Sequence, residues 1–173
     1  MSLAQVQSVV ALFVGLIASY AGLLIGMALL MPAQTEVATN VLERSPKRCL
    51  LSGLGMLVLI VIALVLANVP NPAVKIVAFL ALLGMSGMIV VGGAGLAHLM
   101  GKRIGEMSGA KTSFGTLVRG SIVYTLAMFF PFVGWWLFAP VSVIYALGAG
   151  AIALWPFRRS VPTTPSFEGQ GAV

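Results

Sequence analysis

Long apolar segments separated by short polar gaps run through most of the sequence. Three of them each hold the roughly 20 residues that an α-helix needs to cross the hydrocarbon core of a bilayer. They lie at Val6–Leu30, Cys49–Asn68 and Val74–Met100. The pattern therefore predicts three membrane-spanning helices in the first hundred residues.

A fourth apolar region, Gly120–Trp155, is too long for one ordinary span and contains Pro131. Proline inside a helix costs about 3 kcal/mol, because it removes a backbone hydrogen bond and clashes with the preceding turn. We therefore expect a break near residues 131–134 and two further helices, Ser113–Phe130 and Val133–Trp155, paired as a hairpin.

The gap between the first two spans carries its own helical pattern. Within Thr35–Arg44, apolar side chains recur at Val37, Val41 and Leu42, with charged residues elsewhere. This spacing predicts a short helix at the membrane interface. The predicted fold is all-α, a polytopic membrane helical bundle of five transmembrane helices plus this interfacial helix. Residues 1–155 form one transmembrane domain, and residues 156–173, rich in Pro, Ser, Thr and Gly, form a flexible cytoplasmic tail.

The composition agrees with a membrane protein. Hydrophobic residues make up 60% of the chain and charged residues only 8%, and the mean hydropathy is +1.07. The formal charge of +6 arises from basic residues in the gaps between apolar runs, where they act as topology signals and contact anionic lipid headgroups. The expected partners are therefore the lipid bilayer and other membrane subunits, and no nucleic acid.

The basic residues also predict how the chain crosses the membrane, since Lys and Arg accumulate on the cytoplasmic side. With five spans and an outside N-terminus, only Lys75 falls outside. The nine that fall inside are Arg44, Lys47, Arg48, Lys102, Arg103, Lys111, Arg119, Arg158 and Arg159. We expect a multi-pass protein of the bacterial inner (cytoplasmic) membrane with a cytoplasmic C-terminus.

Four residues are predicted to anchor helix ends at the membrane surface. Arg119 lies in the second turn of its predicted helix, where its stem can extend back to cytoplasmic headgroups. Trp135 and Trp136 flank the outer break and Trp155 lies at the inner end, as in the aromatic belts of membrane proteins. An aromatic binding box is the alternative for the tryptophans.

Catalytic groups are scarce in this sequence. It contains no Asp, and its four Glu residues are in predicted loops or the tail. No carboxylate pair, metal-ligand cluster or Ser/His or Cys/His pair occurs at helical spacing. We therefore expect no enzymatic activity, and the lack of a buried acid also disfavours a proton-coupled transporter.

His98 is the one candidate cofactor ligand. It follows glycine-rich residues 92–95 near the predicted cytoplasmic end of a span, and small residues could leave room for haem or a chlorophyll-type pigment. The preferred interpretation is an interfacial or helix-capping histidine with no cofactor.

Small residues recur at helical spacing in two spans and predict close helix packing. The sets are Gly15, Ser19, Gly22 and Gly26 in the first span, and Ser142, Ala146 and Gly150 in the fifth. Packing within the chain is preferred over a seam between copies.

Two stretches, residues 41–54 and residues 131–135 followed by 146–151, resemble the hydrophobic region of bacterial bactofilin-like, polymer-forming membrane proteins. In those proteins an amphipathic stretch leads through a proline into a membrane helix, and a later hairpin carries a Pro-x-x-Gly-Trp-like turn. The chain lacks their β-helical domain, so the resemblance implies membrane anchoring or scaffolding without polymer formation.

These features give three functional hypotheses. The first is a non-catalytic multi-pass membrane subunit or scaffold within a larger inner-membrane assembly. The second is a cofactor- or pigment-binding accessory subunit of an electron-transfer or light-harvesting complex, with His98 as ligand. The third is a small channel or carrier.

Overall fold

The computed structural model describes residues 3–108, 113–130 and 132–154, and every regular element in them is helical. The all-α prediction is thus confirmed. The elements are α1 (Leu3–Leu30), α2 (Pro32–Arg44), α3 (Pro46–Ala67), α4 (Pro72–Ser108), α5 (Ser113–Phe129), the π-helical turn η1 (Gly134–Phe138) and α6 (Ala139–Leu154). The predicted tail and Trp155 lie outside the described residues.

Among the residues that the structure describes, four helical segments are long and apolar enough to cross a membrane. They are Gln5–Leu30, Pro46–Ala67, Pro72–Met107 and Gly134–Leu154, whereas Phe114–Phe129 is apolar but shorter. The structure is therefore compatible with membrane insertion through several helices. The fifth span over Ser113–Phe130 stays a prediction.

Helix boundaries follow local backbone chemistry. Pro32, Pro46 and Pro72 each occupy the start of a helix, where the missing N–H would have no partner anyway. The apolar run of the third predicted span ends at Met100, but α4 continues to Ser108 through a segment that contains the good helix formers Lys, Arg, Glu and Met.

The predicted break between the last two helices is confirmed. α5 ends at Phe129, and the next helical turn begins at Gly134. Between them Phe132 has a positive φ of 67°, a conformation that L-residues rarely adopt. The predicted last helix is present, and it begins with a π-helical turn that continues directly into α6, which places Pro140 in the first turn of α6.

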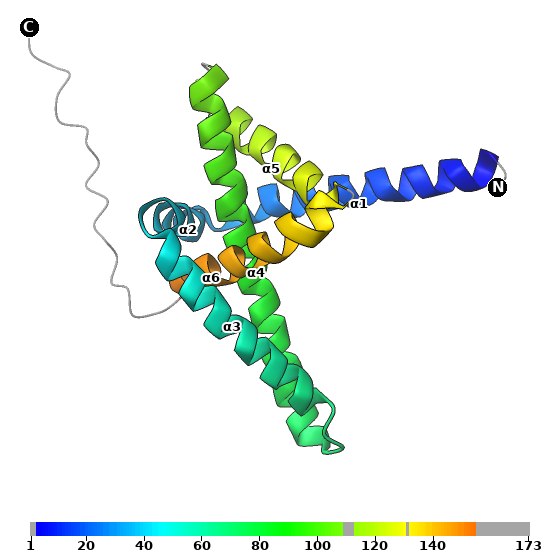
Figure 1. Cartoon of the computed structure of the whole chain (residues 1–173), viewed down its shortest axis with the longest axis vertical. Coiled ribbons are helices and arrows are strands. Elements are labelled where there is room, and N and C mark those ends of the chain that lie inside the picture. The colour runs from blue at the N-terminus through cyan, green and yellow to red at the C-terminus, as the bar shows by residue number, and fades with distance from the viewer. Residues whose placement is uncertain (1–2, 109–112, 131, 155–173) are drawn as a thin grey trace, which may run out of the picture.

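The helices form a packed centre with projecting arms (Figure 1). α4 is the long axis, α3 pairs with its first half as a hairpin, and α6 packs against both. α5 packs on α4 and α1, and α2 packs on α4 and α6. In Figure 1 α1 and the far end of the α3–α4 hairpin leave the centre in different directions.

The short helix predicted at the interface is present as α2, and it packs against other helices of the chain. Five of its side chains are buried: Thr35, Ala38, Thr39, Val41 and Leu42. Most of its apolar face is therefore covered by protein, and the charged face of Glu36, Glu43 and Arg44 stays exposed.

Candidate functional site

Glycines hold α6 against the α3–α4 hairpin. A Cβ at Gly148 would overlap the backbone carbonyl of Cys49 in α3, and one at Gly150 would overlap that of Met88 in α4. The contacts are reciprocal, because a Cβ at Gly92 would overlap the carbonyl of Ala146. Such backbone contact is how helices associate where no hydrophobic driving force operates between them.

A second glycine contact joins α5 to α4. A Cβ at Gly101 would overlap the carbonyl of Thr116, and one at Gly120 would overlap that of Ala97. α5 therefore crosses α4 as closely as α6 crosses the α3–α4 hairpin, and this crossing positions the rest of α5.

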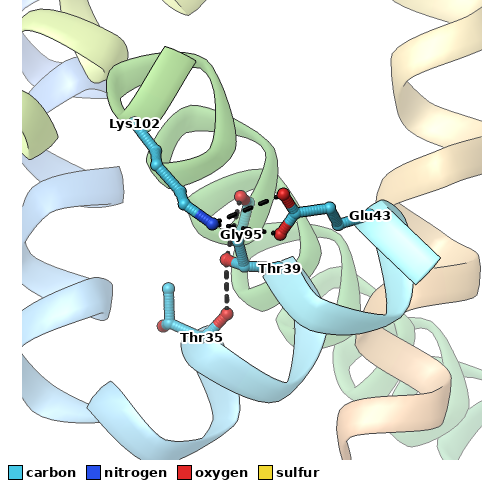
Figure 2. A network of polar contacts seen from close by, with 5 residues as sticks. All are labelled: Thr35, Thr39, Glu43, Gly95 and Lys102. Atoms are coloured by element: carbon cyan, nitrogen blue, oxygen red, sulfur yellow. Dashed lines mark hydrogen bonds and ion pairs between the residues drawn. The ribbon is translucent and has the colours of Figure 1, made fainter. Parts of the chain in front are cut away.

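Polar contacts attach α2 to α4 (Figure 2). The buried Thr39 Oγ1 lies 2.8 Å from the carbonyl oxygen of Thr35 and 3.2 Å from that of Gly95, so its proton is shared between the two helices. Near the end of α2, Lys102 Nζ lies 3.2 Å from a carboxylate oxygen of Glu43. Both side chains of this ion pair are exposed, so it contributes at most about 1 kcal/mol.

Hydroxyl groups from several helices meet in the core. The side-chain hydroxyl of Tyr124 in α5 interacts with those of Tyr20 in α1 and Ser142 in α6, and Ser142 Oγ donates to the carbonyl oxygen of Ala139 at 3.1 Å. Both tyrosine hydroxyls lie 3.9 Å from the position that a Cβ on Gly93 of α4 would occupy. Tyr20, Tyr124 and Ser142 form what we call the hydroxyl cluster. They join α1, α5 and α6 beside Gly93 of α4.

A fully buried serine lies one turn before Tyr124 on α5. Ser121 Oγ has no hydrogen-bond partner among the described residues, although the backbone carbonyl of Ser121 accepts a 2.7 Å bond from Thr125 Oγ1. An unsatisfied buried hydroxyl carries a desolvation cost. No side chain of the hydroxyl cluster is charged at neutral pH, so the group can bind and position but not supply a charged acid or base.

The small residues predicted in the last span are all buried. Ser142 is 5% exposed and Ala146 1% exposed, and Gly150 contacts Met88. This face of α6 therefore packs within the chain.

The small residues of α1 are placed differently. A Cβ at Gly15, Gly22 or Gly26 would meet nothing within 4 Å in the described part of the chain, and Ser19 is exposed. The preferred interpretation, packing of this stripe within the chain, is therefore corrected. The reason is that α1 turns its opposite face, centred on Leu24, toward the core.

His98 lies on α4 one turn after the point where α2 docks, and its side chain is half-buried. The glycines before it are in close contact with other helices: Gly92 with Ala146, Gly93 with Leu24, and Gly95 with Ala38. The room that a flat ring would need beside these glycines is filled by α6, α1 and α2. In the described ranges, no three His, Cys, Asp or Glu side chains gather as a metal site.

Three of the residues predicted as membrane-surface anchors lie in the described part of the chain, and all three are exposed. Trp135 is 69% and Trp136 84% exposed on η1, and Arg119 is exposed on α5. Trp135 lines a pocket together with the aromatic rings of Tyr20 and Phe129, whereas Trp136 does not line this pocket, so the alternative of an aromatic binding box stays a prediction for Trp135.

Comparison with known proteins gives no relative: no protein-family model, curated protein or solved structure matches the chain. The resemblance to bactofilin-like membrane proteins stays an expectation drawn from the sequence.

Proposed function

We propose that this chain is a non-catalytic, multi-pass subunit or scaffold of the bacterial inner membrane, and that it joins a larger membrane assembly through α1. The observation that carries the proposal is the unequal packing of α1. Its C-terminal part is fixed in the core by Leu24 and Ala28, whereas the side chains of residues 5–16 are all exposed.

The exposed part of α1 has the composition of a helix that contacts other helices or lipid. Large apolar side chains such as Val9 (66% exposed) and Leu12 (69%) cover it. The open glycines Gly15, Gly22 and Gly26 form a stripe on which a neighbouring helix could approach the backbone closely. A partner helix there would complete the packing that the chain itself leaves open.

The distribution of charge supports the predicted orientation. The ion pair between Lys102 and Glu43 brings the end of α4 beside the end of α2. Arg44, Lys47 and Arg48 follow directly in sequence and are exposed. A basic surface of this kind suits the cytoplasmic headgroup region with its anionic lipids.

Native electrophoresis after mild detergent extraction tests the proposal. The wild-type chain should migrate in a complex larger than itself. Gly22→Leu and Gly26→Leu should release it from that complex, because the added side chains would hold a partner helix away. Gly84→Leu is the matched control, since Gly84 is equally open but lies on α4. Unchanged migration of both α1 variants would contradict the proposal.

A further inference from the structure

A pocket of about 290 Å³ lies where α1, α5, η1 and α6 meet. Its walls are Tyr20 from α1, Met128 and Phe129 from α5, Trp135 from η1, and Ala139 from the start of α6. Three of the five side chains are aromatic. The pocket opens on the surface of the molecule.

Ring contacts fix the α1 side of this pocket. The ring of Phe129 is edge-on to Phe13 at 5.6 Å and to Tyr20 at 6.4 Å between centroids. Phe129 therefore contacts α1 at two successive positions along its length. The hydroxyl of Tyr20 is engaged by Tyr124, so Tyr20 presents mainly its ring to the pocket.

The chain reversal after α5 fixes the other side. Gly134 lies against the backbone carbonyls of Ala127 and Met128, where a Cβ would clash. The positive φ of Phe132 and the π-helical turn that follows bring Trp135 back beside the end of α5. π-helical turns and strained residues cluster at functional positions, and here they form one wall of the pocket.

The surroundings decide what can fill the pocket. Apolar residues that contact its lining or neighbour it in sequence are exposed: Phe13 (44%), whose ring contacts Phe129, and Phe130 (60%) and Leu137 (66%), which flank Phe129 and Trp135 in sequence. In a bilayer such side chains face hydrocarbon. The open, mostly apolar pocket offers water few hydrogen-bond partners, and an acyl chain that enters it gains dispersion contacts along its walls. A hydrocarbon chain therefore fits the pocket better than water does.

We propose that this pocket binds one hydrocarbon chain of a membrane phospholipid, held between Tyr20 and Trp135. The volume is at the small end of the roughly 300–1,000 Å³ typical of ligand pockets, so it holds part of one acyl chain. The bound chain contacts α1 and η1 together and thereby supports the angle at which α1 projects. This inference rests on the membrane insertion in the proposed function and not on assembly through α1.

Quenching of tryptophan fluorescence by brominated phospholipid tests the inference on the full chain in vesicles. One variant keeps only Trp135 (Trp136→Phe, Trp155→Phe), and the other keeps only Trp136 (Trp135→Phe, Trp155→Phe). Vesicles of phosphatidylcholine with brominated acyl chains should quench both, because both side chains contact lipid.

Filling the pocket should change the quenching of Trp135 but not that of Trp136. Adding Ala139→Phe should lower the quenching of Trp135 about twofold, because the new ring occupies the space of the bound chain. The quenching of Trp136 should stay unchanged. Val141→Phe is the matched control, since Val141 is exposed on the same helix and does not line the pocket.

Each outcome has one reading. Equal quenching of Trp135 with and without Ala139→Phe would contradict the proposal that the pocket binds an acyl chain. If Ala139→Phe fails to give folded protein, Met128→Phe fills the same pocket from α5. It should likewise lower the quenching of Trp135 and leave that of Trp136 unchanged. In the variant that keeps only Trp136 and carries no pocket substitution, absence of quenching would contradict membrane insertion itself. Failure of the proposed function is therefore distinguishable from failure of the lipid-binding proposal.

Discussion

α6 and α1 are both apolar helices with small residues at helical spacing, yet they are packed in opposite ways. Every residue from Ala146 to Ala151 of α6 is buried, and its glycines lie against backbone carbonyls of α3 and α4. The glycines of α1 face open space. The difference teaches that a glycine stripe shows where close packing is possible, and that only the neighbouring helices decide whether it occurs within the chain.

The same substitution should have opposite effects in these two regions. Gly148→Ala should lower the free energy of unfolding by about 3 kcal/mol, because its methyl group would overlap the carbonyl of Cys49. Gly22→Ala should leave it unchanged or raise it by up to about 1 kcal/mol, because alanine favours helix. Unfolding in mixed detergent measures both. Equal effects at the two positions would remove the contrast between α6 and α1.

The hydroxyl cluster joins α1 to the packed centre, so it can be used to weaken that link alone. Tyr124→Phe keeps the ring contact with Phe138 but removes the hydroxyl that interacts with Tyr20 and Ser142. We expect a loss of about 0.6–1.7 kcal/mol, the range of interhelical polar interactions in membranes. Tyr20→Phe removes only one of these interactions and should cost less. A larger loss for Tyr20→Phe would show that Tyr124 is not the central member.

Replacing Ser121 should raise the free energy of unfolding, in contrast to the tyrosine substitutions. Its buried hydroxyl has no partner in the part of the chain that the structure describes, so Ser121→Ala should raise the free energy of unfolding by about 1 kcal/mol. Thr125→Ser is a suitable control, because it keeps the hydroxyl that donates to the Ser121 carbonyl. A loss of stability in Ser121→Ala would mean that the hydroxyl does bind something in the folded protein.

Removing the ion pair between α2 and α4 should have the smallest effect on the free energy of unfolding. Glu43→Gln removes the charge of the exposed pair with Lys102, and we expect a change below about 0.5 kcal/mol that vanishes in high salt. Measuring unfolding at low and high salt checks both parts. A larger, salt-independent loss would show that the pair positions α2.

Some of this architecture could be predicted from the sequence because local chemistry fixes it. Pro131 marks the break after α5, and the apolar spacing of Val41 and Leu42 marks α2 as a helix. The packing face of α1 could not be predicted in the same way. A helix that is apolar on all sides carries no periodic signal for its buried face, so Leu24 and Gly22 look equivalent in sequence.

The hydroxyl cluster was missed for a related reason. Tyr20, Tyr124 and Ser142 lie far apart in the sequence on separate helices, and a hydroxyl in a helix is unremarkable, because it can bond to its own backbone. Only the crossing of three helices brings them together. The glycines before His98 kept a cofactor as the alternative interpretation, whereas in the structure their small size serves contacts with α6, α1 and α2.

The central claim, that α1 presents its glycine face to another helix, is tested most directly by cysteine cross-linking in native membranes. With Cys49 replaced by Ser, the chain would carry one cysteine, at position 22 (Gly22→Cys) or at position 24 (Leu24→Cys). A bifunctional thiol-to-amine cross-linker of short reach should join the Gly22→Cys chain to a neighbouring subunit as a product of higher mass. Leu24→Cys should give none, because Leu24 is fully buried on the opposite face. Equal products from both positions, or none from Gly22→Cys, would contradict the account.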